Sequence, residues 1–242
     1  MKHLGSLIDR MKQGLPSQLR HENPYLAEAL ELEGIILTGA DFNIGKTSSV
    51  SENQILFKKN ICSKYAKPDQ PLFLEIGCYL GRNVIEFAQA NTGLNILGLE
   101  ITYKRTVKSG RKIKALKLDN ARIGICDARD FLQNIPDSEL AATCIFFPDP
   151  WPKAKHEKNR IFTPKFFANL AHKTKPAGWC WIKSDALEYF EHAKKCALEN
   201  GWDLSDEPLP TILEPRPYVT AFQALFQEKN VPTYACVFQK KS

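Results

Sequence analysis

The alternation of apolar and amphipathic segments after residue 71 constrains the fold more than any other feature of this sequence. Short apolar runs of strand length are separated by segments whose apolar residues recur at helical spacing. The runs are LFLEIG, NILGLE, ARIGICD, LAATCIFF and GWCWIKSD (72–77, 95–100, 121–127, 140–147 and 178–185). Strands that alternate with helices form a mostly parallel sheet, because each helix returns the chain to the same end of the sheet. The sequence therefore predicts an α/β fold with helices on both faces of the sheet.

Two parts of the chain depart from this alternation. The expected helices occupy 81–91, 101–118, 128–135, 163–174 and 186–200. The last apolar run, TYACVFQK (233–240), is a closing strand that no helix follows. The residues up to about 65 do not follow the alternation either. We therefore predict an N-terminal extension, 1–65, and a main domain, 66–242.

The composition is ordinary for a soluble globular protein, with 43% hydrophobic and 25% charged residues. No apolar run approaches the ~20 residues that a membrane-spanning helix needs. The first residues lack the continuous apolar segment of a signal peptide, so we expect a cytoplasmic protein without a membrane partner. The seven cysteines include no C-x-x-C pair, so we expect reduced thiols and no metal site.

Positive charge is concentrated in two places. The net charge is +6, from 33 basic and 27 acidic residues. The segment from Ile101 to Leu118 holds seven cations and no acid, which taken alone also fits a solvated helix face. A second cluster consists of Lys153, Lys155, Lys158 and Arg160. Two such clusters in one chain favour a polyanionic partner.

Acidic residues recur in the same register of the expected strands, either inside them or directly after them. They are Glu75, Glu100, Asp127, Asp149 and Asp185. Any one of them could be a helix cap. The carboxyl ends of parallel strands meet at one edge of a sheet, where ligands bind. Together the acids predict a cleft lined with hydrogen-bond acceptors.

The loop after the first strand, EIGCYLGRN, contains Gly77 and Gly81 four residues apart. It is similar to the E-x-G-x-G-x-G loop of S-adenosylmethionine-dependent methyltransferases, except that Tyr79 replaces the middle glycine. At the end of the second strand, Glu100 is placed to accept hydrogen bonds from both ribose hydroxyls of an adenosine.

The stretch FFPDPWPKAKHEKNR (146–160) holds a carboxylate between prolines and follows it with cations. Pro148 and Pro150 fix their own φ angles and restrict the residues before them. Asp149 therefore loses little further freedom when a ligand binds. The cations that follow can hold phosphates, which position a nucleic acid without recognising its sequence.

The motifs EIGCYLG, GLE, CDA, FFPDPWPKAKHEKNR, SDALEY and RPYVTAF together resemble the tRNA (guanine-N7)-methyltransferase family in order and spacing, over about residues 70 to 240. The resemblance implies a class I methyltransferase (Rossmann-like) fold, with a mostly parallel seven-stranded sheet and an antiparallel last strand. It also implies S-adenosylmethionine as donor, S-adenosylhomocysteine as product and guanine 46 of tRNA as acceptor.

The same resemblance implies roles for individual residues. It implies Asp149 as the catalytic residue. The implied cofactor-binding residues are Glu75, Gly77, Gly81, Glu100, Asp127 and Asp149. The implied substrate-binding residues are Lys153, Asp185, Thr220 and Gln223, and the implied RNA-binding residues are Lys155, His156, Lys158 and Arg160. The expected partner is tRNA, with neither a metal nor a membrane, and the protein is expected to be a monomer or a homodimer.

Two residues depart from the family pattern and keep alternatives open. Tyr79 must turn outward, stack on the ligand or obstruct it, and Gln223 stands where the family has glutamate. One alternative is a non-catalytic RNA-binding paralogue that has kept the fold. Another is a methyltransferase acting on an exocyclic amino group, since D-P-W-P resembles [DN]-P-P-[YFW] with its last two residues interchanged.

Overall fold

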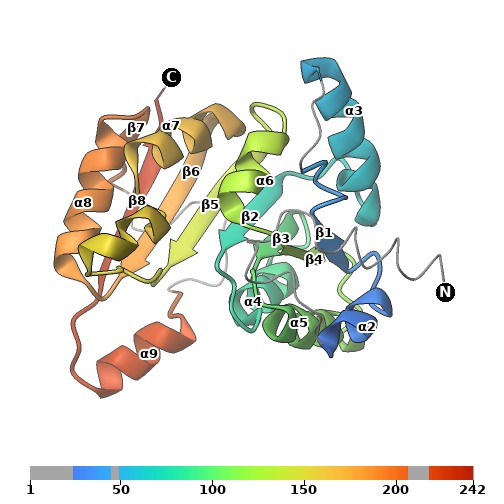
Figure 1. Cartoon of the computed structure of the whole chain (residues 1–242), viewed down its shortest axis with the longest axis horizontal. Helices are drawn as coiled ribbons and strands as arrows, with labels where there is room; N and C mark the ends of the chain where they lie inside the picture. Colours follow the sequence, from blue (N-terminus) through green and yellow to red (C-terminus); the bar gives the residue numbers. More distant parts are fainter. Residues whose placement is uncertain (1–23, 45–48, 207–217, 242) are drawn as a thin grey trace. The chain divides into compact units, whose positions relative to one another are not determined.

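The computed structural model describes residues 24–44, 49–206 and 218–241, which belong to two compact units, Met1–Pro136 and Asp137–Ser242 (Figure 1). The described residues contain eight strands, four in each unit. In the first unit the elements are α2 (Tyr25–Leu30), β1 (Ile36–Thr38), α3 (Val50–Asn60), η2 (Cys62–Lys64), β2 (Leu72–Ile76), α4 (Arg82–Ala90), β3 (Asn95–Leu99), α5 (Tyr103–Ala115), β4 (Ala121–Ile125) and α6 (Ala128–Asn134).

The four strands of the first unit are parallel and lie in the order β1-β4-β3-β2. Every residue of these strands is buried. A strand that is covered on both faces has no solvent side that needs polar residues. That is why the sequence shows continuous apolar runs here.

Two glycines mark the opposite faces of this sheet. A side chain at Gly98 of β3 would collide with Val84 of α4, so α4 packs closely on one face. A side chain at Gly124 of β4 would collide with Phe42, whose ring packs edge-on against Phe131 of α6. The predicted helices on both faces of the sheet are therefore confirmed for this unit.

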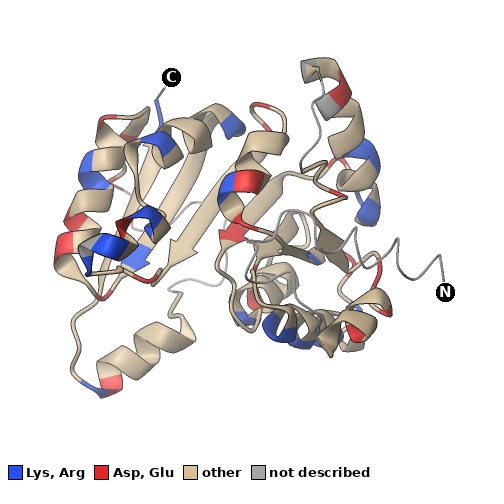
Figure 2. Cartoon of the chain, in the orientation of Figure 1, with Lys and Arg blue, Asp and Glu red and all other residues tan. Residues whose placement is uncertain are grey.

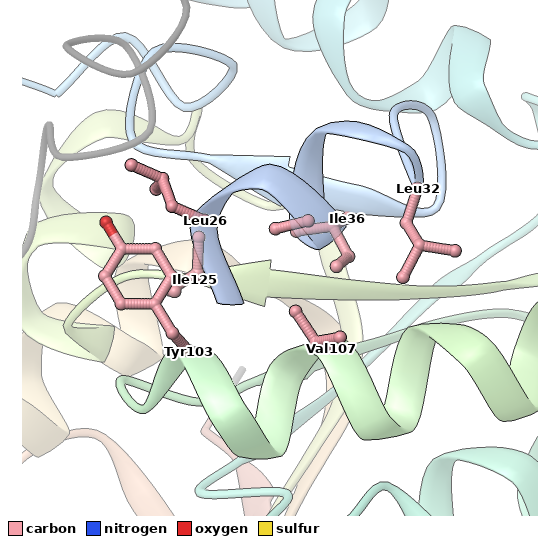
Figure 3. Close-up of a cluster of buried hydrophobic side chains, with 7 residues drawn as sticks. Leu26, Leu32, Ile36, Tyr103, Val107 and Ile125 are labelled. Carbon is pink, nitrogen blue, oxygen red and sulfur yellow. The ribbon is translucent and has the colours of Figure 1, made fainter. Parts of the chain in front are cut away.

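The segment before residue 66 adds a strand to the sheet. β1 pairs in parallel with β4, and α2 packs on α5 beside it. Figure 3 shows the apolar cluster that joins them, with Leu26, Leu32 and Ile36 facing Tyr103 and Val107. The predicted seven-stranded sheet was therefore one strand short, because β1 has only three residues and shows no recognisable period. The boundary placed at residue 65 stays a prediction.

The second unit contains the antiparallel strands. β5 (Leu140–Phe146) and β6 (Thr174–Ser184) are parallel, whereas β8 (Tyr234–Lys240) runs antiparallel to both β6 and β7 (Trp202–Leu204). The predicted antiparallel last strand is confirmed. The helices are η3 (Ala154–Asn159), α7 (Pro164–Lys173), α8 (Leu187–Leu198) and α9 (Ala221–Glu228).

All seven cysteines are free thiols, and five of them are buried. Among the described residues no group of histidine, cysteine, aspartate and glutamate is arranged to hold a metal ion. Within the same residues no helix is long and apolar enough to cross a membrane.

Candidate functional site

In the first unit, the loop between β2 and α4 has an unusual backbone. Gly77, Tyr79 and Gly81 have φ angles of 77°, 51° and 67°, all in the left-handed region. The N–H groups of Gly77 and Cys78 both donate to the carbonyl of Leu99 at 2.9 Å. The loop is thus held against the end of β3, with three left-handed residues in five positions.

The two predicted glycines of this loop have different tasks. A Cβ at Gly81 would lie 2.7 Å from Cβ of Ser109, so this glycine allows α4 to begin against α5. A Cβ at Gly77 would meet nothing within 4 Å. Gly77 therefore borders open space that a ligand can occupy, whereas Gly81 is required by packing.

Glu75 lies in β2, just before the loop, and is 2% exposed. Its Oε1 accepts a hydrogen bond from Nδ2 of Asn83 at 2.6 Å, while its Oε2 is buried without a partner. Burial raises the pKa of Glu75 to about 7, although hydrogen bonds from Asn83 and Val84 oppose the shift. A buried acceptor without a donor is costly in a folded protein, so Oε2 is available to a donor that a ligand would supply.

Glu100 follows β3 directly and is buried. Its Oε1 accepts from the N–H of Thr102 at 2.9 Å, and its Oε2 lies 3.7 Å from a guanidinium nitrogen of Arg105. That distance is an ion pair but not a hydrogen bond, so Oε2 keeps acceptor capacity.

Tyr79 packs against Arg105 and does not fold into its own loop. The guanidinium carbon of Arg105 lies 4.5 Å from the centre of the Tyr79 ring, which is 40% exposed. Tyr79, Arg105 and Glu100 thus form a continuous series of contacts at the ends of β2 and β3. Of the three orientations considered for Tyr79, the structure shows the outward one.

Asp127 follows β4 and is the N-cap of α6, accepting from the N–H of Arg129 at 2.8 Å. The Arg129 side chain also donates to both carboxylate oxygens, at 3.0 and 2.7 Å. Burial would raise the pKa of Asp127, but the hydrogen bonds from Arg129 outweigh it and lower the pKa. Asp127 therefore has the capping role considered for it, and its carboxylate stays ionised.

These residues fit the methyl donor that the sequence implies. S-adenosylmethionine carries a sulfonium, an ammonium and a ribose diol. The unpartnered oxygen of Glu75 and the remaining acceptor capacity of Glu100 suit such cationic and hydroxyl donors. Gly77 leaves the space beside them open.

In the second unit, the loop after β5 holds Asp149 in a strained frame. Phe147 and Trp151 have φ angles of 52° and 45°, which are costly for bulky residues. The Asp149 side chain between them is exposed. The N–H of Phe147 donates to the carbonyl of Lys183 at 2.8 Å, which ties the loop to β6. This geometry agrees with the expectation that Asp149 has little conformational freedom.

The basic residues after Trp151 divide into two groups. Arg160 donates to the carbonyls of Pro150 and Trp151 at 3.1 to 3.2 Å, so its guanidinium braces the loop. The side chains of Lys153, Lys155 and Lys158 are exposed on or beside η3. The ring of His156 lies 5.4 Å from that of Trp151.

Asp185, Thr220 and Gln223 lie near the ends of β6 and α9. Asp185 follows β6 and is partly exposed. The buried hydroxyl of Thr220 caps α9 by accepting from the N–H of Gln223 at 3.0 Å. The side-chain oxygen of Gln223 accepts from Nζ of Lys183 at 2.7 Å. Arg216 and Pro217 of the RPYVTAF motif lie outside the described residues.

Lys183 is a residue of this site that the sequence did not single out. It is 3% exposed, and its ammonium lies near three aromatic rings, those of Trp181 at 4.4 Å, Phe146 at 5.2 Å and Tyr218 at 5.6 Å. Burial lowers the pKa of Lys183 to about 8. The available signal was a lysine inside the apolar run GWCWIKSD, where a charge is expensive unless it has a function.

A cationic surface lies along α5, as expected from the first basic cluster. The side chains of Lys104, Lys108 and Lys112, four residues apart, are exposed. In Figure 2 several basic positions are coloured blue along this helix. Arg111 on the same helix is paired with Glu28 of α2. The opposite face of α5 is buried.

The fourteen predicted site residues thus divide between the two units. Five lie in the first unit and nine in the second. Of the five acids expected near a strand end, Glu75 lies within β2, and Glu100 and Asp185 directly follow β3 and β6. Asp127 and Asp149 lie two and three residues beyond the ends of β4 and β5. Sequence reasoning missed Asn83, Arg105, Arg129 and Lys183, all of which contact a predicted site residue.

Comparison with known proteins supports the assignment of these motifs. A family model described as "Putative methyltransferase" matches residues 69–236. The tRNA (guanine-N(7)-)-methyltransferase of Trichormus variabilis is 31% identical over 191 residues, covering 74% of this chain and 85% of that protein. The enzyme of the same name from Paracoccus denitrificans is 29% identical over 174 residues, covering 72% and 74%.

Solved structures with the same fold include the 16S rRNA methyltransferase KamB, with a TM-score of 0.54, 14% identity and coverage of 81% of this chain and 96% of that chain. The aminoglycoside resistance methyltransferase NpmB1 has a TM-score of 0.53 and 14% identity, with coverage of 81% and 95%. At such identities the likeness establishes the fold alone. The predicted class I methyltransferase fold is confirmed, with the additional strand β1.

Proposed function

Since the chain belongs to the tRNA (guanine-N7)-methyltransferase family, we propose that it transfers a methyl group from S-adenosylmethionine to N7 of guanine 46 in tRNA. The family assignment makes it an S-adenosylmethionine-dependent methyltransferase. The single observation that carries the proposal is the exposed carboxylate of Asp149, held between two left-handed residues and followed by exposed lysines.

In the first unit we propose Glu75, Gly77, Gly81, Glu100 and Asp127 as the donor-binding residues. Bound S-adenosylmethionine supplies an electrophilic methyl group on its sulfonium. Glu75 and Glu100 offer carboxylate oxygens to its ammonium and hydroxyl groups, and Gly77 leaves room beside them. Gly81 and Asp127 act through the loop and through the start of α6.

Guanine N7 has a lone pair and no hydrogen, so its methylation needs no strong base. It needs the base to be placed in line with the methyl group. The purine becomes cationic as the methyl group is transferred, and a fixed carboxylate stabilises that charge. Asp149 suits this task because Pro148 and Pro150 restrict its backbone and the hydrogen bond of Phe147 ties the loop to β6. We therefore propose Asp149 as the catalytic residue, which also contributes to donor binding.

The remaining proposed roles concern the RNA. We assign Lys153, Asp185, Thr220 and Gln223 to the acceptor nucleotide, with Thr220 acting through the cap that positions Gln223. Lys155, His156 and Lys158 are assigned to the tRNA backbone, and Arg160, which the sequence placed with them, is assigned to the support of their loop. Exposed lysines contact phosphates as point charges and give affinity without sequence recognition.

The test is methyl transfer from labelled S-adenosylmethionine to unmodified tRNA, with identification of the modified nucleoside by mass spectrometry. We expect 7-methylguanosine, and Asp149→Ala should lower the rate at least ~100-fold, the scale of losing an electrostatic stabiliser. The circular dichroism spectrum should not change, because Asp149 is exposed. Product methylated on an exocyclic amino group, or tRNA binding without transfer, would contradict the proposal.

The tRNA partner is part of this proposal, as is a cytoplasmic location. The oligomeric state, monomer or homodimer, and the boundary at residue 65 are predictions of the sequence. Size-exclusion chromatography with light scattering measures the first of these directly.

A further inference from the structure

The side chain of Gln223 is fixed at both ends. Its backbone N–H donates to Oγ1 of Thr220 at 3.0 Å, which sets the first turn of α9. Its Oε1 accepts from Nζ of Lys183 at 2.7 Å. Nζ of Lys183 also donates to the carbonyl of Tyr218 at 3.0 Å, so the ammonium is held by two acceptors. Gln223 therefore has little freedom to rotate its amide.

The chemistry of the pair decides which way the amide points. A lysine ammonium has three donors and no acceptor, so only the oxygen of Gln223 can face it. The amide nitrogen must then point away from Lys183. The ammonium lies near the rings of Trp181 and Phe146 and is buried, so bulk water has little access to this contact. Lys183 thus leaves the N–H groups of the Gln223 amide as the groups that face away from it.

We propose that Lys183 orients Gln223 so that its amide N–H recognises O6 of the acceptor guanine, which makes the chain selective for 6-oxopurines and indifferent to the 2-amino group. The inference rests on the proposed function and specifies its substrate recognition. O6 lies beside N7 on the same edge of guanine, and both are acceptors. A glutamate at this position would instead accept hydrogen bonds from N1–H and the 2-amino group. Adenine presents a donor at position 6 and would be rejected by the amide donor.

Lys183 is a positioning residue in this scheme, and Gln223 is the group that touches the base. The test uses tRNAs that carry guanosine, inosine or 2-aminopurine at the methylated position. Inosine lacks the 2-amino group, and 2-aminopurine lacks O6 and N1–H. Values of kcat/KM are compared between the parent and Gln223→Glu on each tRNA. Because both proteins meet the same base, the ratio cancels the intrinsic reactivity of N7.

For the parent we expect inosine to be methylated within about threefold of guanosine, while 2-aminopurine is at least about fivefold worse, the scale of one hydrogen bond. For Gln223→Glu the preference for guanosine over inosine should rise at least about fivefold. The inference is overturned if the parent already discriminates against inosine as strongly as Gln223→Glu does.

Two further variants test whether the orientation of the Gln223 amide matters, in addition to the presence of its side chain. Gln223→Met keeps the length and removes the donor, so it should lose the preference for guanosine over 2-aminopurine. Lys183→Met releases the amide and should reduce the same preference while Gln223 is still present. If Lys183→Met keeps the full preference while folded, as judged by circular dichroism, the orienting role is wrong. If it does not fold, the Gln223 variants alone decide whether the amide acts as a donor.

The failure of this inference differs from the failure of the proposed function. Methylation of guanosine at N7 with the opposite response to the analogues would remove the inference alone. The absence of N7 methylation on the guanosine tRNA would remove the proposed function and with it the inference.

Discussion

At the scale of single residues, the proposed role of Glu75 in donor binding should make that binding depend on pH. Burial raises the pKa of Glu75 to about 7, and its Oε2 has no partner. A cationic ligand favours the ionised carboxylate, so binding below pH 7 must release a proton. We expect the affinity for S-adenosylmethionine to fall by up to about tenfold per pH unit as the pH drops from 7 to 5.5.

Calorimetric titration between pH 5.5 and 8.5 measures this dependence, with Glu75→Gln as the matched variant. The ligand's own titration is the same for both proteins, so the ratio of their dissociation constants isolates Glu75. The ratio should change with pH near 7. A constant ratio would mean that Glu75 is not ionised by the bound donor.

The titration of Lys183 should make the free energy of unfolding depend on pH. Burial lowers its pKa to about 8 in the folded state, below the ordinary value of 10.5. Between these values the unfolded chain binds more protons, so the free energy of unfolding rises with pH in this window, by up to about 3 kcal/mol. Below pH 8 the protein carries the full loss of stability that comes from burying the charged ammonium of Lys183.

Urea denaturation at pH 7, 8.5 and 10 measures this effect. Lys183→Met should remove the rise that the parent shows, whereas Lys165→Met, at an exposed lysine on α7, should keep it. If the free energy of unfolding depends on pH equally in the parent and in Lys183→Met, Lys183 does not titrate in this window.

The site could be predicted where residue type and strand position coincide. Glu75, Glu100 and Asp127 lie in or after the strands to which the sequence assigned them. A lysine inside an apolar strand marks Lys183 as unusual, but its contact with Gln223 could not be found this way, because the two residues are 40 positions apart. The orientation of Tyr79 toward Arg105 depends in the same way on a contact 26 positions along the chain.

At the scale of elements, the basic segment around η3 should divide into charges that bind RNA and a charge that holds the loop. Lys155 and Lys158 are exposed, whereas Arg160 donates to Pro150 and Trp151. We expect Lys155→Gln with Lys158→Gln to weaken tRNA binding and to reduce the slope of log affinity against log salt by about 1.5, for two phosphates.

Arg160→Gln should instead lower turnover with a smaller change in that slope, because its main contacts are to carbonyls of its own loop. Fluorescence anisotropy with tRNA at 50 to 200 mM salt measures both variants. An equal loss of slope for Arg160→Gln and for either single lysine variant would show that Arg160 also binds a phosphate.

The long elements between residues 72 and 200 could be predicted from their periods, whereas α3 and the shortest strands were missed. β1 and β7 have three residues each, too few to show an alternation. Trp202 of β7 is fixed by its hydrogen bond to the carbonyl of Phe167, which is a tertiary contact. By contrast, α9 could have been found, because Phe222, Leu225 and Phe226 have helical spacing after the N-cap Thr220.

At the scale of the whole molecule, the alternation along the chain was sufficient to predict the fold class, because each helix and strand length fits a parallel sheet. The contribution of the first 65 residues was not predictable. β1 joins the sheet through backbone pairing with β4, and the apolar cluster in Figure 3 unites residues more than 80 positions apart, such as Leu26 and Val107. Such contacts have no local signature.

The last prediction concerns the stability that this early segment contributes to the chain. Ile36 of β1 is 3% exposed, within the cluster, whereas Ile55 of α3 is 65% exposed. Ile36→Ala should lower the free energy of unfolding by about 2–5 kcal/mol, through lost burial and the cavity left behind. The matched variant Ile55→Ala should change it by no more than about 0.5 kcal/mol.

Urea denaturation monitored by circular dichroism and by tryptophan fluorescence provides the measurement. If residues 24–65 fold together with the rest of the chain, both probes should report one transition that Ile36→Ala shifts to lower urea. An early transition that appears only in circular dichroism, with the main transition unmoved, would show that the segment unfolds independently. The predicted boundary at residue 65 would then separate two folding units, and a chain beginning at residue 66 should keep the parent's affinity for S-adenosylmethionine.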